Sequence, residues 1–206
     1  MKAEEIQREE MVKTQIEGRG IKDPRLLKAM REVPRHEFVP EDSRESAYQD
    51  RPIPIGNGQT ISQPYIVALM VELCGLGGEE RVLEIGTGSG YAAAILSRLA
   101  EGVYTVERDH ELCMRASVLL RTKGYENIQC IEGDGYGGYK PGAPYDAVLL
   151  SAAPPEIPKP LFDQLKDGGR LVGPVGVGSQ YLVRVVRRGD EFSTTKHGGV
   201  RFVPMV

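Results

Sequence analysis

The stretch Val-Leu-Glu-Ile-Gly-Thr-Gly-Ser-Gly-Tyr at residues 82–91 decides the fold. Its apolar start is typical of a short buried strand, and Gly86, Gly88 and Gly90 follow at alternate positions. Glycine has no Cβ, so such a turn adopts unusual backbone angles and approaches a ligand closely. The next residues, Ala-Ala-Ala-Ile-Leu at 92–96, favour a helix. A strand, a glycine turn and a helix in this order indicate a nucleotide site, where backbone N–H groups and a helix N-terminus face the ligand.

The carboxylate of Glu84 lies inside the strand that leads into this turn. A pyrophosphate has little use for a neighbouring carboxylate, whereas a cofactor with a sulfonium and an ammonium group suits an acidic turn. The pattern Glu-x-Gly-x-Gly-x-Gly resembles the first motif of S-adenosylmethionine (AdoMet)-dependent methyltransferases. One alternative is a dinucleotide site, but its G-x-G-x-x-G pattern needs glycine where Tyr91 stands. The other is a plain tight turn, which the flanking strand and helix disfavour.

Composition narrows the class of protein. At 206 residues with a net charge of −3, the chain suits one domain with a substantial core and has no basic field for nucleic acid. Cys74, Cys113 and Cys130 lack C-x-x-C spacing, so neither a disulfide framework nor a metal site is expected. The charged N-terminus is unlike a signal peptide, and no apolar run has membrane-spanning length. We therefore expect a cytoplasmic protein that binds neither membrane nor nucleic acid. Because the sequence has no coiled-coil heptad and no long apolar surface helix, we also expect a monomer.

The chain is expected to form a single domain, with an N-terminal part at 1–78 and a cofactor-binding core at 79–206. In the N-terminal part, Asp23 and Pro24 are typical of an N-cap and a first helical residue. The predicted elements there are a surface helix at 3–17, a second helix through about Met30, an extended connector at 34–40, a Pro- and Gly-rich loop at 51–62 and a helix at 63–73.

Strands and helices alternate in the core. We predict strands at 81–85, 103–107, 127–132, 145–151 and 170–175, and helices at 90–100, 110–123 and 158–166. This alternation predicts a doubly wound, mostly parallel sheet with helices on both faces, the Rossmann-like fold of class I AdoMet-dependent methyltransferases. The last segments, at 181–187, 191–197 and 200–204, predict an antiparallel C-terminal edge.

In an open α/β sheet the ligand lies beyond the carboxyl ends of the strands. Glu107 ends the second core strand, 21 positions after Gly86, where a carboxylate can accept both ribose hydroxyls. After the third strand, Asp134 beside Gly135 can reach the exocyclic amine of adenine, although a simple turn residue is an alternative. These residues complete a predicted cofactor site with Glu84 and the glycine turn.

No general base stands at these strand ends. The three histidines lie elsewhere, and Ser-Ala-Ala-Pro-Pro at 151–155 has little acid–base capacity. Methyl transfer to a carboxylate needs no base, because a carboxylate is already ionised at neutral pH. It needs in-line positioning and exclusion of water.

Five blocks along the chain resemble protein-L-isoaspartate (D-aspartate) O-methyltransferases. In family order they are Val-Pro-Arg-His-Glu-Phe-Val-Pro at 33–40, Gly-Asn-Gly-Gln-Thr-Ile-Ser-Gln-Pro at 56–64, Ala-Ala-Pro-Pro-Glu-Ile-Pro at 152–158, Gln-Leu-Lys-Asp-Gly-Gly-Arg-Leu-Val-Gly-Pro-Val-Gly at 164–176 and Val-Arg-Phe-Val-Pro-Met at 200–205. The resemblance implies AdoMet as cofactor, S-adenosylhomocysteine as product, and isoaspartyl-containing proteins and peptides as substrates. The α-carboxyl is methylated, the ester closes spontaneously to a succinimide, and hydrolysis returns some normal aspartyl. Activity on D-aspartyl residues is a further possibility.

The resemblance also implies substrate-site residues. The family's active-site serine maps onto Ser62, with Thr60 in the same loop. The Ser62 hydroxyl can donate to one carboxylate oxygen while the other attacks the methyl group. Its place before Pro64 also fits a helix N-cap, and both roles could coexist. Val200 and Phe202, in the last predicted strand, are expected to pair with the peptide backbone or flank its site.

Other functions remain as alternatives. The chain could methylate a small-molecule carboxylate or another substrate, although nucleic acid would favour a basic patch and an amide nitrogen would favour an Asn/Asp-Pro-Pro-Tyr motif. It could also be a non-catalytic module with this fold, which the acidic and glycine positions disfavour. The glycine spacing makes a hydride-transferring dehydrogenase the weakest alternative.

Overall fold

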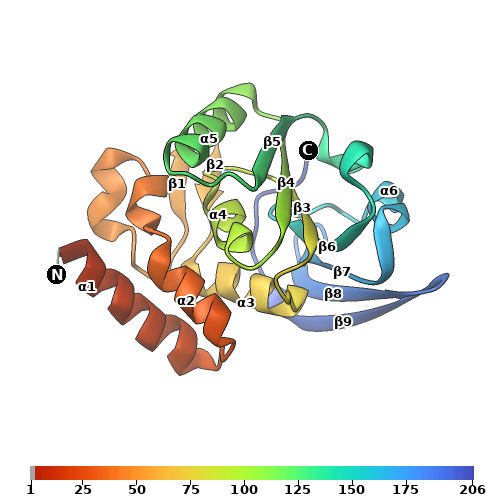
Figure 1. The fold of residues 1–206 in the computed structure, drawn as a ribbon, viewed down its shortest axis with the longest axis horizontal. Coiled ribbons are helices and arrows are strands. Elements are labelled where there is room, and N and C mark those ends of the chain that lie inside the picture. The colour runs from red at the N-terminus through yellow and green to blue at the C-terminus, as the bar shows by residue number, and fades with distance from the viewer. Residues whose placement is uncertain (1–2) are drawn as a thin grey trace.

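The computed structural model describes residues 3–206, which fold around a seven-stranded sheet (Figure 1). The strand order is β5-β4-β3-β6-β7-β8-β9. Pairing is parallel from β5 to β7 and antiparallel from β7 to β9. The strands are β3 (Arg81–Ile85), β4 (Gly102–Glu107), β5 (Ile128–Glu132), β6 (Tyr145–Leu150), β7 (Leu165–Val175), β8 (Gln180–Arg188) and β9 (Glu191–Val200). This architecture confirms the predicted mostly parallel sheet with an antiparallel C-terminal edge.

Side-chain alternation along the strands divides the core between the two faces of the sheet. Val82 packs into a cluster with helices α3, α4 and α5 and the N-terminal helices, whereas Leu83 packs on the opposite face with Leu161 of α6. Successive strand residues point to opposite faces, so apolar residues in sequence cover both. The helices are α1 (Ala3–Glu10), α2 (Pro24–Glu32), α3 (Pro64–Cys74), α4 (Tyr91–Ser97), α5 (His110–Thr122) and α6 (Lys159–Asp163).

The N-terminal helices follow their sequence signals closely. The helical run that starts with α1 continues through π-helical and 3-10 turns to Arg19 and ends at Gly20, whose φ is 101°. Asp23 caps α2, accepting from the backbone N–H groups of Arg25 and Leu26, and Pro24 occupies the first turn. These two helices lie side by side in Figure 1, next to α3.

Two predictions for the N-terminal part were wrong. The connector at 34–40 contains a 3-10 helix, Arg35–Phe38, rather than extended chain. The loop at 51–62 contains an antiparallel hairpin of β1 (Ile53–Gly56) and β2 (Gln59–Ile61). Asn57 and Gly58 form its turn with φ values of 51° and 70°. Positive φ at both central residues is what a tight hairpin turn requires, and Asn-Gly supplies it.

The C-terminal part also differs from its prediction. The glycines at 168 and 169 lie within β7, which begins at Leu165. The segment 200–204 is not a further strand, because β9 ends at Val200. The chain then turns back over the sheet, where Ala153 bonds to the backbone of Val203 and Met205. These bonds place the last residues beside the carboxyl end of β6.

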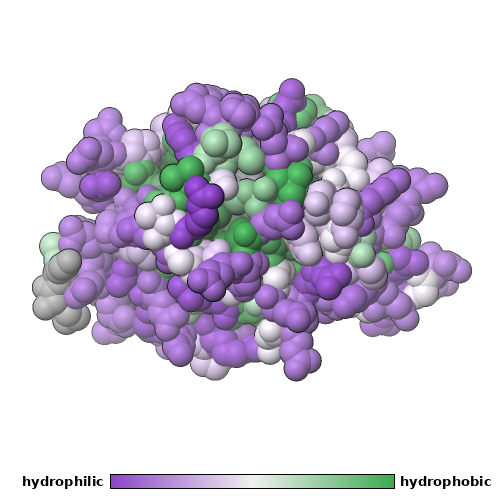
Figure 2. All heavy atoms as spheres, turned by 45° about the horizontal axis from the view of Figure 1, so that its top comes forward, coloured by the Kyte–Doolittle hydropathy of each residue, from purple (hydrophilic) through white to green (hydrophobic). Residues whose placement is uncertain are grey.

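One face of the molecule has a central hollow where hydrophobic residues are visible within a hydrophilic rim (Figure 2). Among residues 3–206, no helix is long and apolar enough to cross a membrane.

Candidate active site

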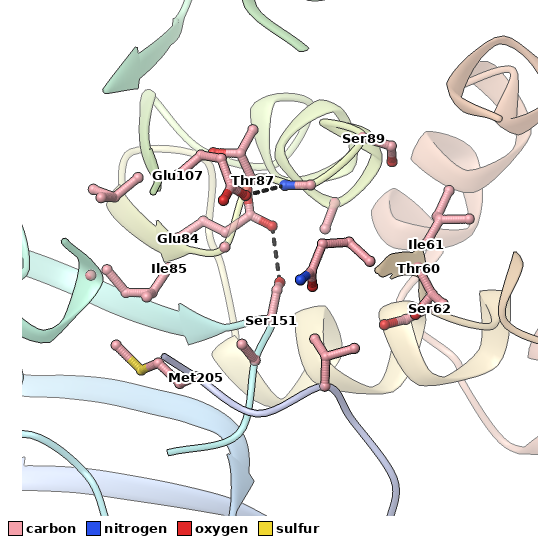
Figure 3. A pocket seen from close by; sticks show the side chains of 18 of the residues that line it. Thr60, Ile61, Ser62, Glu84, Ile85, Thr87, Ser89, Glu107, Ser151 and Met205 are labelled. Carbon is pink, nitrogen blue, oxygen red and sulfur yellow. Dashed lines mark hydrogen bonds between the residues drawn. The ribbon is translucent and has the colours of Figure 1, made fainter. Parts of the chain in front are cut away.

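A cavity opens at the carboxyl ends of β3, β4 and β6 (Figure 3). β3 lies between β4 and β6 in the sheet, so the strand order reverses here, which is where doubly wound folds bind ligands. The cavity encloses about 880 Å³ of space between its walls, part of it open to solvent. Its walls come from the glycine turn, the end of β4, the β1–β2 hairpin and the last four residues.

The glycine turn forms the base of this cavity. Gly86 and Gly88 line it with φ values of 94° and 52°, in the left-handed region that favours glycine. Gly90 does not line the cavity. A Cβ there would lie 3.1 Å from Cδ1 of Leu120, so this glycine lets α4 pack closely against α5. The cofactor role of Gly90 stays a prediction, and its packing role is visible in the structure.

Glu84 lies fully buried at the inner end of the cavity. Its carboxylate accepts from the hydroxyls of Thr105 (2.7 Å) and Ser151 (3.1 Å), and the second bond is drawn in Figure 3. Burial raises the pKa of Glu84 to about 8, because both partners are neutral and too few to replace the lost hydration. A carboxylate in this setting favours a cationic ligand.

Glu107 lies at the end of β4, and its side chain accepts hydrogen bonds from two backbone segments. One carboxylate oxygen accepts from the backbone N–H of Gly88 at 2.9 Å, and the other accepts from the backbone N–H of Asp109 at 3.0 Å. Each oxygen keeps a second lone pair, so the side chain can still accept from two hydroxyls of a ligand. The predicted ribose contact fits this arrangement.

The end of β5 brings one of its two predicted site residues to the cavity wall. Gly135 lines the cavity, and a Cβ there would overlap the side chain of Ile85. Asp134 is exposed, does not line the cavity and accepts from the N–H of Tyr136 at 2.9 Å. Its contact with adenine stays a prediction, and its turn role is visible in the structure.

A groove adjoins the cavity on the side of the hairpin and the C-terminal strands. Thr60, Ser62, Ser151 and Val203 line both spaces, so these residues form their junction. Figure 3 shows the Ser62 side chain on the hairpin side of the cavity. The cap alternative for Ser62 is wrong, because Gln63 is the N-cap of α3 and no side chain caps that helix.

Val200, the last residue of the edge strand β9, and Phe202, which lies beyond that strand, both line the groove. The side chain of Gln180 bonds to both backbone groups of Phe202, accepting from its N–H at 2.6 Å and donating to its carbonyl at 3.1 Å. The N–H of Phe202 is therefore not free for a peptide, whereas its carbonyl keeps a second lone pair and its side chain flanks the groove.

Sequence reasoning missed Ser151, whose segment was expected to provide only small residues. The structure places its hydroxyl on Glu84 and its side chain at the junction of cavity and groove. The available signal was its position directly after β6, at the same sheet edge as Glu84. Among residues 3–206, no group of His, Cys, Asp and Glu side chains is arranged to hold a metal ion.

The sheet topology, the glycine turn and the two acidic strand ends define a class I AdoMet-dependent methyltransferase. The family model described as protein-L-isoaspartate(D-aspartate) O-methyltransferase matches residues 6–206. The chain is 57% identical over 200 residues to protein-L-isoaspartate O-methyltransferase 2 of Shewanella sediminis, covering 96% of this chain and 82% of the relative. It is 55% identical over 201 residues to the Methanoculleus marisnigri enzyme, covering 97% and 91%. The chain belongs to the protein-L-isoaspartate(D-aspartate) O-methyltransferase family.

Solved structures share this fold. A protein-L-isoaspartate O-methyltransferase that is 31% identical superposes with a TM-score of 0.87, covering 96% of this chain and 65% of that one. A Plasmodium falciparum structure, 22% identical, has a TM-score of 0.82, covers 97% and 98% of the two chains, and shares the fold. That protein was solved in complex with S-adenosyl-L-homocysteine.

Proposed function

We propose that this chain transfers the methyl group of AdoMet to the α-carboxyl of L-isoaspartyl residues, and to the side-chain carboxyl of D-aspartyl residues, in damaged proteins and peptides. The observation that carries this proposal is the junction at Ser62, where an acidic cofactor cavity meets an open groove. A peptide in the groove would bring a carboxylate to the opening of the cavity, while the rest of the chain remains outside.

The cavity fits AdoMet by its chemistry. Glu84 and Glu107 both line the cavity, and we propose that Glu84 favours the cationic part of the cofactor while Glu107 accepts from the ribose hydroxyls. Gly86 and Gly88 leave room for close approach, and the proposed adenine contacts are with Gly135, which lines the cavity, and with Asp134 beside it. AdoMet supplies the electrophilic methyl group and leaves as S-adenosylhomocysteine.

The protein's part in the reaction is to position the substrate carboxylate. The Ser62 hydroxyl donates to one carboxylate oxygen, which leaves the other free to attack in line, and Thr60 contacts the same substrate. No base is required, since the nucleophile is ionised at neutral pH. The hairpin and the C-terminal residues 203–206 line the cavity and exclude water from the reacting atoms.

Two further properties belong to the proposal. The chain acts as a monomer, supported by a cavity and a groove that are both lined by residues of a single chain. It acts in the cytoplasm on protein rather than nucleic acid, supported by three free thiols and a net charge of −3.

The proposed repair activity is tested by following the linkage itself. A peptide with one isoaspartyl residue is incubated with the protein and AdoMet over several hours and separated by chromatography. Repeated methylation and succinimide hydrolysis should convert it progressively into the aspartyl peptide, in proportion to S-adenosylhomocysteine formed. An isoaspartyl peptide that persists while AdoMet is bound would overturn the function.

A further inference from the structure

The two spaces that meet at Ser62 differ in their charged residues. The cavity has Glu84 and Glu107 among its lining residues, together with Arg108. The groove is lined by Arg19 and Arg201, and none of its lining residues within the described chain is acidic. This contrasts with the chain as a whole, whose net charge is −3. The cationic surface is therefore a local property of the groove.

Arg201 is held in the groove by its neighbours. Val200 and Phe202, on either side of it, pack against the hydrophobic core. Gln180 further fixes the backbone at Phe202 through two hydrogen bonds. The side chain of Arg201 is exposed, and no ion pair within residues 3–206 includes it. Its charge is available to a ligand.

Arg19 lines the groove from the N-terminal part of the chain but is already engaged. Its guanidinium bonds to Asp50 at 2.7 Å and lies 3.5 Å from the ring centroid of Tyr65. These contacts fix its position and offset part of its charge. Arg201 is therefore the stronger determinant of which charges the groove accepts.

We propose that the groove selects isoaspartyl segments with an acidic residue close to the damaged position, and that Arg201 determines this specificity. The inference rests on the proposed function, and it adds a preference for one class of isoaspartyl substrate. An acidic neighbour gains an ion pair with Arg201, whereas a basic neighbour is repelled. Both effects act on binding rather than on the methyl transfer itself, because the reacting carboxylate lies at Ser62.

The test uses three isoaspartyl peptides of equal length, flanked on both sides by Glu, Ser or Lys. kcat/KM is measured with labelled AdoMet. An exposed ion pair changes an equilibrium by about two- to fivefold, so attraction and repulsion together predict an acidic-to-basic ratio of about tenfold. The ratio should arise mainly in KM and should fall when NaCl is raised from about 0.05 M to 0.5 M, because salt screens exposed charges.

Three variants assign the effect to its residue. Arg201→Gln should reduce the acidic-to-basic ratio to about twofold, and Arg201→Lys should restore most of it. Arg121→Gln removes the same charge from the exposed face of α5 and should leave the ratio unchanged. A ratio that survives Arg201→Gln would overturn the assignment.

The failures of the two proposals are distinguishable. If the Ser-flanked isoaspartyl peptide is methylated but the wild-type ratio is near one, the charge preference alone is refuted. If none of the three peptides is methylated, the proposed function fails and the preference with it.

Discussion

We expect the buried carboxyl of Glu84 to make AdoMet binding depend on pH. Its pKa is raised to about 8 by burial, so it is mostly protonated at pH 7 in the free protein. At pH 7, one unit below this pKa, about 0.9 of the Glu84 side chains are protonated. A cationic ligand beside Glu84 favours the ionised form, so AdoMet binding should release up to about 0.9 proton per protein at pH 7. The ionised fraction of Glu84 rises from about a tenth at pH 7 to about a half at pH 8, so affinity should rise about fivefold between these pH values.

Calorimetry measures this release directly. AdoMet is titrated at pH 7 in two buffers of different ionisation enthalpy, and the difference in heat gives the number of protons released. Glu84→Gln is the matched control, because it keeps the size of the side chain, and any proton released by the ligand's own amine is common to both proteins. The variant should bind AdoMet more weakly and lose the part of the release that comes from Glu84. Equal release from both proteins would refute the role of Glu84.

The same group affects stability without cofactor. The folded pKa of about 8 exceeds the ordinary value of 4.5, so the unfolded chain loses this proton first as pH rises. The contribution of Glu84 to the free energy of unfolding is therefore greatest below about pH 4.5. It declines as the pH rises to about 8, by up to about 5 kcal/mol over this range. Urea unfolding at pH 5 and pH 8 should show a smaller decline for Glu84→Gln than for the wild type. Equal declines would contradict the pKa shift.

Three further substitutions test other parts of the site and fold. Ser62→Ala should lower kcat/KM for an isoaspartyl peptide by at least about tenfold while the Kd for AdoMet changes little, because the hydroxyl orients only the substrate; a fully active variant would exclude this role. Glu107→Ala should raise the Kd for AdoMet by at least about tenfold, since hydrogen bonds to a charged group are lost, and unchanged calorimetric affinity would count against the ribose contact. Gly173→Ala should lower the free energy of unfolding in urea by about 1–3 kcal/mol, because the added Cβ would overlap Leu150. Gly102→Ala is the control, because a Cβ at that position would have no atom nearer than 4.0 Å. Equal losses from the two substitutions would contradict this reasoning.

The core of the fold was predictable because its signals are local. Four apolar strands, the glycine turn after β3 and the Asp-Pro start of α2 each depend on a few adjacent residues. The hairpin at 53–61 was missed although Asn57-Gly58 is a strong turn signal, because Pro and Gly around it suggested irregular chain.

The missed parts of the site depend on contacts between distant segments. Ser151 bonds to Glu84 across 67 positions, and Gly90 faces Leu120 of α5 rather than the cavity. The strand pattern at 200–204 gave no sign that Ala153 and Gln180 would take its backbone hydrogen bonds. Such pairings arise only when the sheet is assembled.

The measurement that tests the central claim most directly uses labelled AdoMet and two peptides that differ only in one L-isoaspartyl or L-aspartyl linkage. The account predicts base-labile label on the isoaspartyl peptide alone, which identifies a methyl ester and the linkage specificity together. Label on neither peptide while AdoMet binds, or equal label on both, would contradict it.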